Sequence, residues 1–178
     1  SDGARRVERV VIHDGYKRFP QELIDHAMAT GEATLLVEFA STTDDIALVK
    51  LAKPVTDVVP VELYEDSPRP GEIVKIIGKG TTGNGATGYS LGAPSRTELR
   101  RAYNEIGSVY DRWFCYRFDE PSSALPLEGA LGNGDSGGPV LTQVEDRWLL
   151  SGLASWKVIE GNVLTATYGP YGHVTSNV

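Results

Sequence analysis

The residues with the clearest chemical potential form the segment Gly134-Asp135-Ser136-Gly137-Gly138-Pro139. A serine hydroxyl becomes a strong nucleophile only when a base removes its proton. Attack on an amide carbonyl places negative charge on oxygen, and N–H donors aimed at that oxygen stabilise it. Glycines beside the serine permit a sharp turn that brings backbone N–H groups together. The segment therefore indicates acyl transfer at Ser136, and the alternative is an ordinary glycine-rich turn between strands.

All six residues match the nucleophile loop of the trypsin and chymotrypsin family of serine proteases, which the chain resembles from about Val10 to Val178. Asp45 matches the catalytic aspartate of that family, and we expect its neighbour Asp44 to be a solvated charge. An aspartate before an apolar strand is more often a turn residue, but its pairing with the Ser136 loop, in the family order, favours the catalytic role. Three further segments resemble the opening strand of the second barrel, the strand beside the substrate and a wall of the specificity pocket, namely Ile76–Gly80, Gly152–Trp156 and Tyr168–Val174.

The resemblance implies a serine endopeptidase that hydrolyses peptide or protein substrates through an acyl-enzyme on Ser136. Asp45 would orient a histidine base, and the amides of Gly134 and Ser136 would form the oxyanion hole. It also implies that Asp135 is bound by a partner, often a chain-terminal amine in this family, which the sequence does not identify. The implied substrate-binding residues are Ala130, Leu131, Ser155, Trp156, Lys157 and Gly169.

The residue at the base of the implied specificity pocket is Ala130, with the apolar Leu131 beside it. A preference for Lys or Arg would need a buried carboxylate there to pair with the substrate cation. We therefore expect an apolar or small substrate side chain. Lys157 stands where the family usually has glycine, and we expect its stem to narrow the entrance while its ammonium reaches solvent.

The histidine that the family places before the catalytic aspartate has no match in the chain. His13 and His26 precede Asp45, but neither has the neighbours of a catalytic histidine, and His173 lies near the C-terminus. We expect the base to lie in N-terminal strands supplied by a second chain, an N-terminal fragment of the same protein, so that this chain alone is inactive. The alternative is a catalytically inactive pseudoprotease that keeps the fold as a binding module.

The elements that must position these residues are predicted to be mainly short strands separated by glycine-rich turns. One helix is expected at Pro20–Thr30, where Leu23, Ile24 and Ala27 share a face and Gly31 can end the helix. The predicted strands are Arg5–His13, Thr34–Phe39, Ile46–Leu51, Glu72–Ile77, Glu98–Tyr103, Arg112–Phe118, Pro139–Val144, Trp148–Trp156 and Leu164–Tyr168.

This pattern favours an all-β fold, which the resemblance specifies as two Greek-key barrels of six strands with the first barrel incomplete. Residues 1–53 would be the remainder of the N-terminal barrel, with the helical insertion near 20–30. Residues 54–71 carry four prolines and would connect the barrels. Residues 72–178 would form the C-terminal barrel that carries the nucleophile.

Composition excludes several other classes. The formal charge of -7 in 178 residues argues against binding to nucleic acid or to an anionic membrane surface, which needs clustered Lys and Arg. The single Cys115 allows no internal disulfide, and we expect it to be buried as a small apolar residue. We expect no cofactor and no metal, and we expect a secreted or periplasmic protein of bacterial origin.

Overall fold

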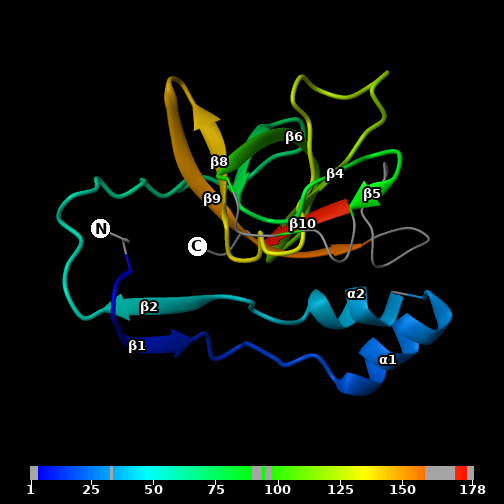
Figure 1. The fold of residues 1–178 in the computed structure, drawn as a ribbon, viewed down its shortest axis with the longest axis horizontal. Helices are drawn as coiled ribbons and strands as arrows, with labels where there is room; N and C mark the ends of the chain where they lie inside the picture. Colours follow the sequence, from blue (N-terminus) through cyan, green and yellow to red (C-terminus); the bar gives the residue numbers. More distant parts are fainter. Residues whose placement is uncertain (1–3, 33, 90–93, 95–97, 159–170, 176–178) are drawn as a thin grey trace.

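Six antiparallel strands form the largest unit of the fold, which is known from a computed structural model. The structure describes residues 4–32, 34–89, 94 and 98–158, together with the backbone of 171–175. The six strands close into a barrel in the order β10-β7-β6-β3-β8-β9 (Figure 1). Their bounds are β3 (Ile73–Gly78), β6 (Arg100–Val109), β7 (Trp113–Arg117), β8 (Pro139–Val144), β9 (Arg147–Val158) and β10 (Tyr171–Thr175).

The interior of this barrel is a single apolar cluster. Along β3 the buried Val74 and Ile76 alternate with more exposed residues, as expected for a strand with one face on a core. The cluster consists of Val74, Ile76, Ile106, Phe114, Tyr116, Leu131, Val140 and Ala154. Because Leu131 and Ala154 belong to it, the core directly supports the segment before Ser136 and the strand that faces the Ser136 loop.

The N-terminal part of the chain forms a separate layer beside the barrel (Figure 1). It contains the antiparallel pair β1 (Val7–Ile12) and β2 (Ala47–Leu51), and the helices α1 (Gln21–Thr30) and α2 (Thr34–Ala40). The two strands pair only with each other among the described residues. One closed barrel and one unclosed ribbon confirm the predicted all-β fold class with an incomplete first barrel.

The helix α2 corrects the prediction of a strand at Thr34–Phe39. Leu35 and Phe39 are four residues apart, as are Leu36 and Ala40, so the apolar residues share one helical face. The rings of Phe39 and Phe19 lie 5.0 Å apart, and Ala40 is buried. Packing of this face therefore overrides the β-branched residues that suggested a strand. The predicted helix α1 is confirmed, with Gly31 in the left-handed conformation at its end.

Most other predicted strands are confirmed, with shifts at their ends. The strand predicted at Glu98–Tyr103 runs on to Val109 as β6, and that predicted at Trp148–Trp156 is β9. The strand predicted at Leu164–Tyr168 lies outside the described residues. Two short strands, β4 (Gly83–Asn84) and β5 (Gly88–Tyr89), form a hairpin in the glycine-rich loop.

The segment between β2 and β3 is attached to the barrel at β6, where the amide of Gly71 donates to the Ile106 carbonyl at 2.8 Å, and at β9. Leu63 forms a bridge to Leu150, and the amide of Tyr64 donates to the Leu150 carbonyl at 2.9 Å. Arg147 of β9 and Glu62 also pair at 2.5 Å.

Neither helix among the described residues is long and apolar enough to cross a membrane.

The fully buried Ile106 provides a test of the barrel core. We expect Ile106→Ala to lower the free energy of unfolding by about 2–5 kcal/mol, because it leaves a cavity that neighbours cannot fill. Ile12→Ala is the matched control, since Ile12 on β1 is 55% exposed while Ile106 is 0% exposed, and it should cost about 1 kcal/mol or less. Urea unfolding followed by tryptophan fluorescence measures both, and equal losses would contradict this location of the core.

Candidate active site

The Ser136 loop is attached to β9 by its own backbone. The amide of Gly137 donates to the Ala154 carbonyl at 2.7 Å, and the amide of Ala154 donates to the Gly138 carbonyl at 2.9 Å. Gly134 and Gly137 have φ angles of 96° and 74°, in the region that favours glycine. These bonds bring Ser136 to the outer surface of the barrel, where the residue is exposed.

Two amides of this loop are left without an acceptor in the described part of the chain. The amides of Asp135 and Gly138 donate to the carbonyls of Gly132 and Asp135 at 3.2 and 2.8 Å. Those of Gly134 and Ser136 make no such bond, and both residues are exposed. Free N–H groups on both sides of a hydroxyl are the arrangement that binds a developing oxyanion.

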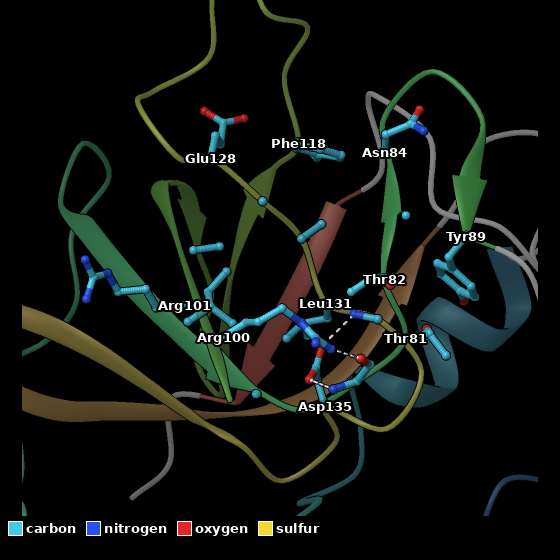
Figure 2. A pocket seen from close by; sticks show the side chains of 18 residues that line it. Thr81, Thr82, Asn84, Tyr89, Arg100, Arg101, Phe118, Glu128, Leu131 and Asp135 are labelled. Carbon is cyan, nitrogen blue, oxygen red and sulfur yellow. Dashed lines mark hydrogen bonds between the residues drawn. The ribbon is translucent and has the colours of Figure 1, made fainter. Parts of the chain in front are cut away.

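The carboxylate of Asp135 is held by two backbone amides. Oδ1 accepts from the amide of Gly80 at 2.6 Å, and Oδ2 accepts from the amide of Gly132 at 2.8 Å. Arg100 donates to the carbonyl of Gly80, and Figure 2 shows its guanidinium pointing toward Asp135. These amides are the partner of Asp135 that sequence analysis left unidentified.

Sequence reasoning missed the supporting role of the loop after β3. A Cβ added to Gly80 would lie 2.5 Å from Cγ of Asp135, and one added to Gly78 would collide with its Oδ1. Thr81 continues the support, because its amide donates to the carbonyl of Asn133 at 2.8 Å. The sequence did contain a signal for this role, the two glycines Gly78 and Gly80. Their function, however, depends on the carboxylate of Asp135, which lies 55 residues after Gly80.

The predicted acid Asp45 contacts β9 beside the Ser136 loop. Its Oδ2 accepts a hydrogen bond of 2.6 Å from the hydroxyl of Ser155. Ser155 follows Ala154, whose carbonyl and amide hold the Ser136 loop. Adjacent residues of one strand thus contact Asp45 and the loop of Ser136.

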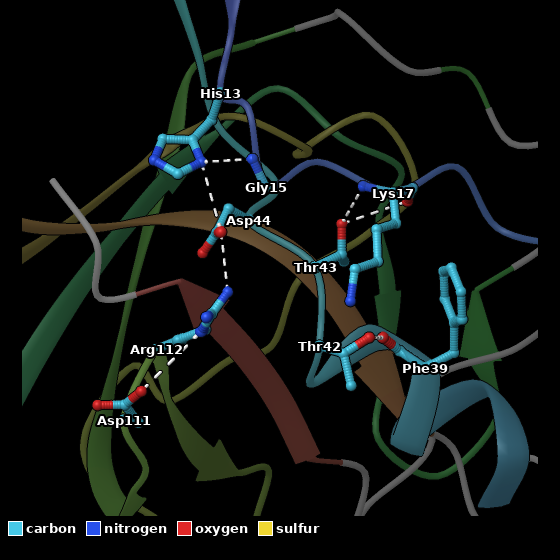
Figure 3. A network of polar contacts seen from close by, with 9 residues as sticks. All are labelled: His13, Gly15, Lys17, Phe39, Thr42, Thr43, Asp44, Asp111 and Arg112. Atoms are coloured by element: carbon cyan, nitrogen blue, oxygen red, sulfur yellow. Dashed lines mark hydrogen bonds and ion pairs between the residues drawn. The ribbon is translucent and has the colours of Figure 1, made fainter.

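The neighbour Asp44 is not the solvated charge that the sequence suggested. It is 7% exposed, and its Oδ2 pairs with Arg112 at 2.8 Å and lies 3.4 Å from Nδ1 of His13 (Figure 3). Burial of a carboxylate is unfavourable unless it is paired, so Arg112 explains why Asp44 can be buried. Asp44 therefore links the N-terminal layer to the turn between β6 and β7.

The histidines that precede Asp45 are engaged away from Ser136. His13 contacts Asp44 and accepts a hydrogen bond of 3.0 Å from the amide of Gly15 at its Nδ1. His26 lies 3.8 Å from Glu32. Of His173 only the backbone in β10 is described. Among the described side chains, therefore, no histidine contacts Ser136 or Asp45.

The predicted substrate-binding residues fall into two groups. Ala130 and Leu131 line a pocket of about 240 Å³ that also contains Asp135, Tyr89 and Arg100. Ser155, Trp156 and Lys157 lie on β9 and do not line it. Gly169 lies outside the described residues. Glu128, an acidic residue of the same pocket, accepts from the amides of Asp119 and Leu125 at 2.6 and 2.7 Å.

The side chain of Lys157 does not reach solvent as the sequence suggested. Its Nζ donates to the hydroxyl of Tyr89 at 2.7 Å and to the carbonyl of Leu131 at 3.1 Å. It also lies 4.2 Å from the centre of the Tyr89 ring. The ammonium therefore bridges from β9 to the segment before Ser136, while the neighbouring Trp156 ring packs edge-on against Trp113 at 5.3 Å.

Burial changes the acidity of two groups near the site. It lowers the pKa of the Lys157 ammonium to about 8, against an opposing effect of the Asp135 carboxylate. Burial also raises the pKa of Cys115, which is 4% exposed, as expected for a packed thiol.

The described residues contain no group of three or more His, Cys, Asp or Glu able to hold a metal ion.

One comparison with known proteins bears on this arrangement. The family model described as Trypsin matches residues 4–178. The matched region includes Asp45, the loop around Ser136 and the whole of β9.

The contact between Gly80 and Asp135 can be tested by adding one methyl group. We expect Gly80→Ala to lower the free energy of unfolding by about 1–3 kcal/mol, because the Cβ displaces the Asp135 carboxylate. The matched control is Gly107→Ala, whose Cβ would have its nearest neighbour, the Cys115 carbonyl oxygen, at 3.8 Å. Urea unfolding of both variants measures the difference, and equal stability would contradict the anchoring of Asp135 by this loop.

The half-buried Lys157 predicts a pH dependence of stability. Its pKa of about 8 lies below its ordinary value of 10.5, so between these values the unfolded chain binds more protons than the folded one. Stability should therefore rise with pH in that window, by at most ~1.4 kcal/mol per pH unit.

The measurement is urea unfolding from pH 7 to 9.5, below the range in which tyrosines ionise. Lys157→Met should lack the rise, so the stability of the native sequence relative to this variant should increase with pH. The exposed Lys53→Met controls for the loss of one positive charge. Parallel profiles for Lys157→Met and the native sequence would show that this ammonium is not desolvated.

Proposed function

The chain belongs to the trypsin family, as its Ser136 loop predicted, and from this premise we propose that it is a serine endopeptidase acting through an acyl-enzyme on Ser136. The observation that carries the proposal is the exposed hydroxyl of Ser136 between the free amides of Gly134 and Ser136 itself. Exposed amides of an ordinary turn bind water, and here two of them belong to residues beside or at a serine hydroxyl, where they could bind an oxyanion instead.

The proposed reaction begins when a histidine base takes the proton of Ser136 Oγ. Oγ then attacks the substrate carbonyl, and the amides of Gly134 and Ser136 hold the oxyanion. The histidine gives the proton to the leaving amine as the C–N bond breaks. Water, deprotonated by the same base, hydrolyses the ester and restores the serine.

Asp45 is the proposed acid that orients the histidine. Ser155 donates to its Oδ2, which leaves Oδ1 as an acceptor for an imidazole N–H. A fixed carboxylate in this position selects the imidazole tautomer whose other nitrogen faces the serine. The hydrogen bond from Ser155 would hold the carboxylate in the orientation that this role needs.

The base is proposed to come from outside residues 1–178. His13 and His26 contact Asp44 and Glu32 instead of the site. The ribbon β1–β2 also exposes apolar side chains that a barrel would bury, with Leu48 72%, Ile12 55% and Val10 53% exposed. An N-terminal fragment of the same protein, bound as a second chain, would cover this surface and supply the histidine to the barrel begun by residues 1–53.

A second candidate function is a binding module without catalysis. It is favoured by one observation, that no histidine contacts Ser136 or Asp45 among the side chains described here. In that case the chain would bind peptides along β9 without cleaving them. In either case we propose a secreted or periplasmic bacterial protein with peptide or protein partners.

The deciding experiment is labelling by a fluorophosphonate probe, which reacts with an activated serine. The probe is applied to residues 1–178 alone and to the protein made with its upstream coding sequence. We expect labelling of the longer protein at Ser136, located by peptide mass spectrometry, and only trace labelling of the shorter chain. Asp45→Asn should slow labelling by roughly 10²–10⁴-fold, by analogy with the Ser-His-Asp template.

The labelling pattern decides between the endopeptidase and the binding module. Ser136→Ala is the control for site specificity, and Ser123→Ala tests an exposed serine outside the Ser136 loop. Strong labelling of residues 1–178 alone would overturn the external base but keep Ser136 as the nucleophile. If neither form is labelled, the endopeptidase proposal fails and the binding module stands.

A further inference from the structure

Lys157 does not itself line the pocket of about 240 Å³, but its ammonium contacts two residues that do, Tyr89 and Leu131. Lys157 follows Ser155 by two residues on β9 and reaches Leu131, five residues before Ser136. An ammonium has three donors, and the contacts to Tyr89 and Leu131 use two of them. The third donor has no acceptor among the described residues.

The partners of Lys157 do not neutralise its charge. The hydroxyl of Tyr89 and the carbonyl of Leu131 are neutral acceptors, and the ring of Tyr89 adds only a cation–π contact. No carboxylate among the described residues forms an ion pair with it. A partly buried cation is stabilised when a carboxylate supplies the missing charge.

The carboxylates near Lys157 are already bound elsewhere. Asp135 accepts from the amides of Gly80 and Gly132, and Glu128 accepts from those of Asp119 and Leu125. Ala130 adds no charge to the pocket wall, while Arg100 and Arg101 also line that pocket. The surroundings of Lys157 would therefore disfavour a cationic substrate side chain and favour an anionic one.

We propose that Lys157 makes this site selective for an acidic side chain, Glu or Asp, on the substrate residue whose carbonyl Ser136 attacks. The proposal rests on the proposed endopeptidase function and names its substrate class. It replaces the apolar or small preference expected from Ala130, because the ammonium that was expected in solvent instead extends to the Leu131 carbonyl. A substrate carboxylate would take the third donor of Lys157 while the contact to Leu131 keeps the ammonium in place.

The test compares kcat/KM for peptides that differ only at this residue, carrying Glu, Gln, Leu or Lys. The enzyme is the form of the protein that the fluorophosphonate labels. We expect Glu to be cleaved roughly 10–100-fold better than Gln, the range of a charge-assisted hydrogen bond, and Lys to be cleaved poorest. In Lys157→Met the Glu-to-Gln ratio should fall to about 1 or below, whereas Lys157→Arg should keep a ratio well above 1.

Ratios within one variant remain valid when its overall activity or folding yield changes, and Lys53→Met should leave the ratio unaltered. Fluorophosphonate labelling is measured in parallel for every variant. Labelling with no preference for Glu over Gln, or a ratio that persists in Lys157→Met, would overturn the specificity proposal and leave the endopeptidase standing. Absence of labelling in every form would overturn the endopeptidase instead.

Discussion

The arrangement of the site depends on the carboxylate of Asp135 and the two amides that bind it. The bonds from Gly80 and Gly132, at 2.6 and 2.8 Å, attach the loop of Ser136 to the loop after β3. The neighbours of Asp135, namely Gly134 and Ser136, are exposed, and their amides have no acceptor among the described residues. A carboxylate leaves water at low cost only when N–H donors replace the water molecules. The fold supplies these donors from its own backbone.

The strand β9 contacts every part of the candidate site, namely the Ser136 loop, Asp45 and the segment before Ser136. Ala154 belongs to the core and holds the Ser136 loop through both of its backbone groups. Ser155 binds Asp45, and Lys157 reaches the segment before Ser136. Nearby residues of one strand therefore position the Ser136 loop, the proposed acid and a cation. Because these residues lie on a strand of the barrel itself, no long loop separates them from the barrel.

The link between the N-terminal layer and the barrel is electrostatic where it is buried. Asp44 is 7% exposed and pairs with Arg112 at the turn after β6. A buried carboxylate without Arg112 would be strongly unfavourable, so this pair helps to hold the segment of Asp45 against the barrel. The two neighbouring aspartates thus have different roles. Asp44 attaches the segment to the barrel through Arg112, and Asp45 contacts Ser155.

The sequence by itself determined the family, the glycine-rich loop around Ser136, and most strands of the barrel. These are local properties, because six contiguous residues specify the loop, and short runs of apolar and β-branched residues between turns indicate strands such as β3 and β8. The structure leaves the amides of Gly134 and Ser136 exposed and without an acceptor among the described residues, and their role as an oxyanion hole stays a prediction.

Only the tertiary structure decided the rest. Thr34–Ala40 became a helix because Phe39 packs on Phe19, a contact that no local pattern encodes. Asp44 became buried because Arg112, 68 residues away, pairs with it. Gly80 and Lys157 gained their roles from Asp135 and from the carbonyl of Leu131. Charge compensation and packing join residues distant in the chain, so the burial of a carboxylate or an ammonium cannot be inferred from its neighbours in sequence.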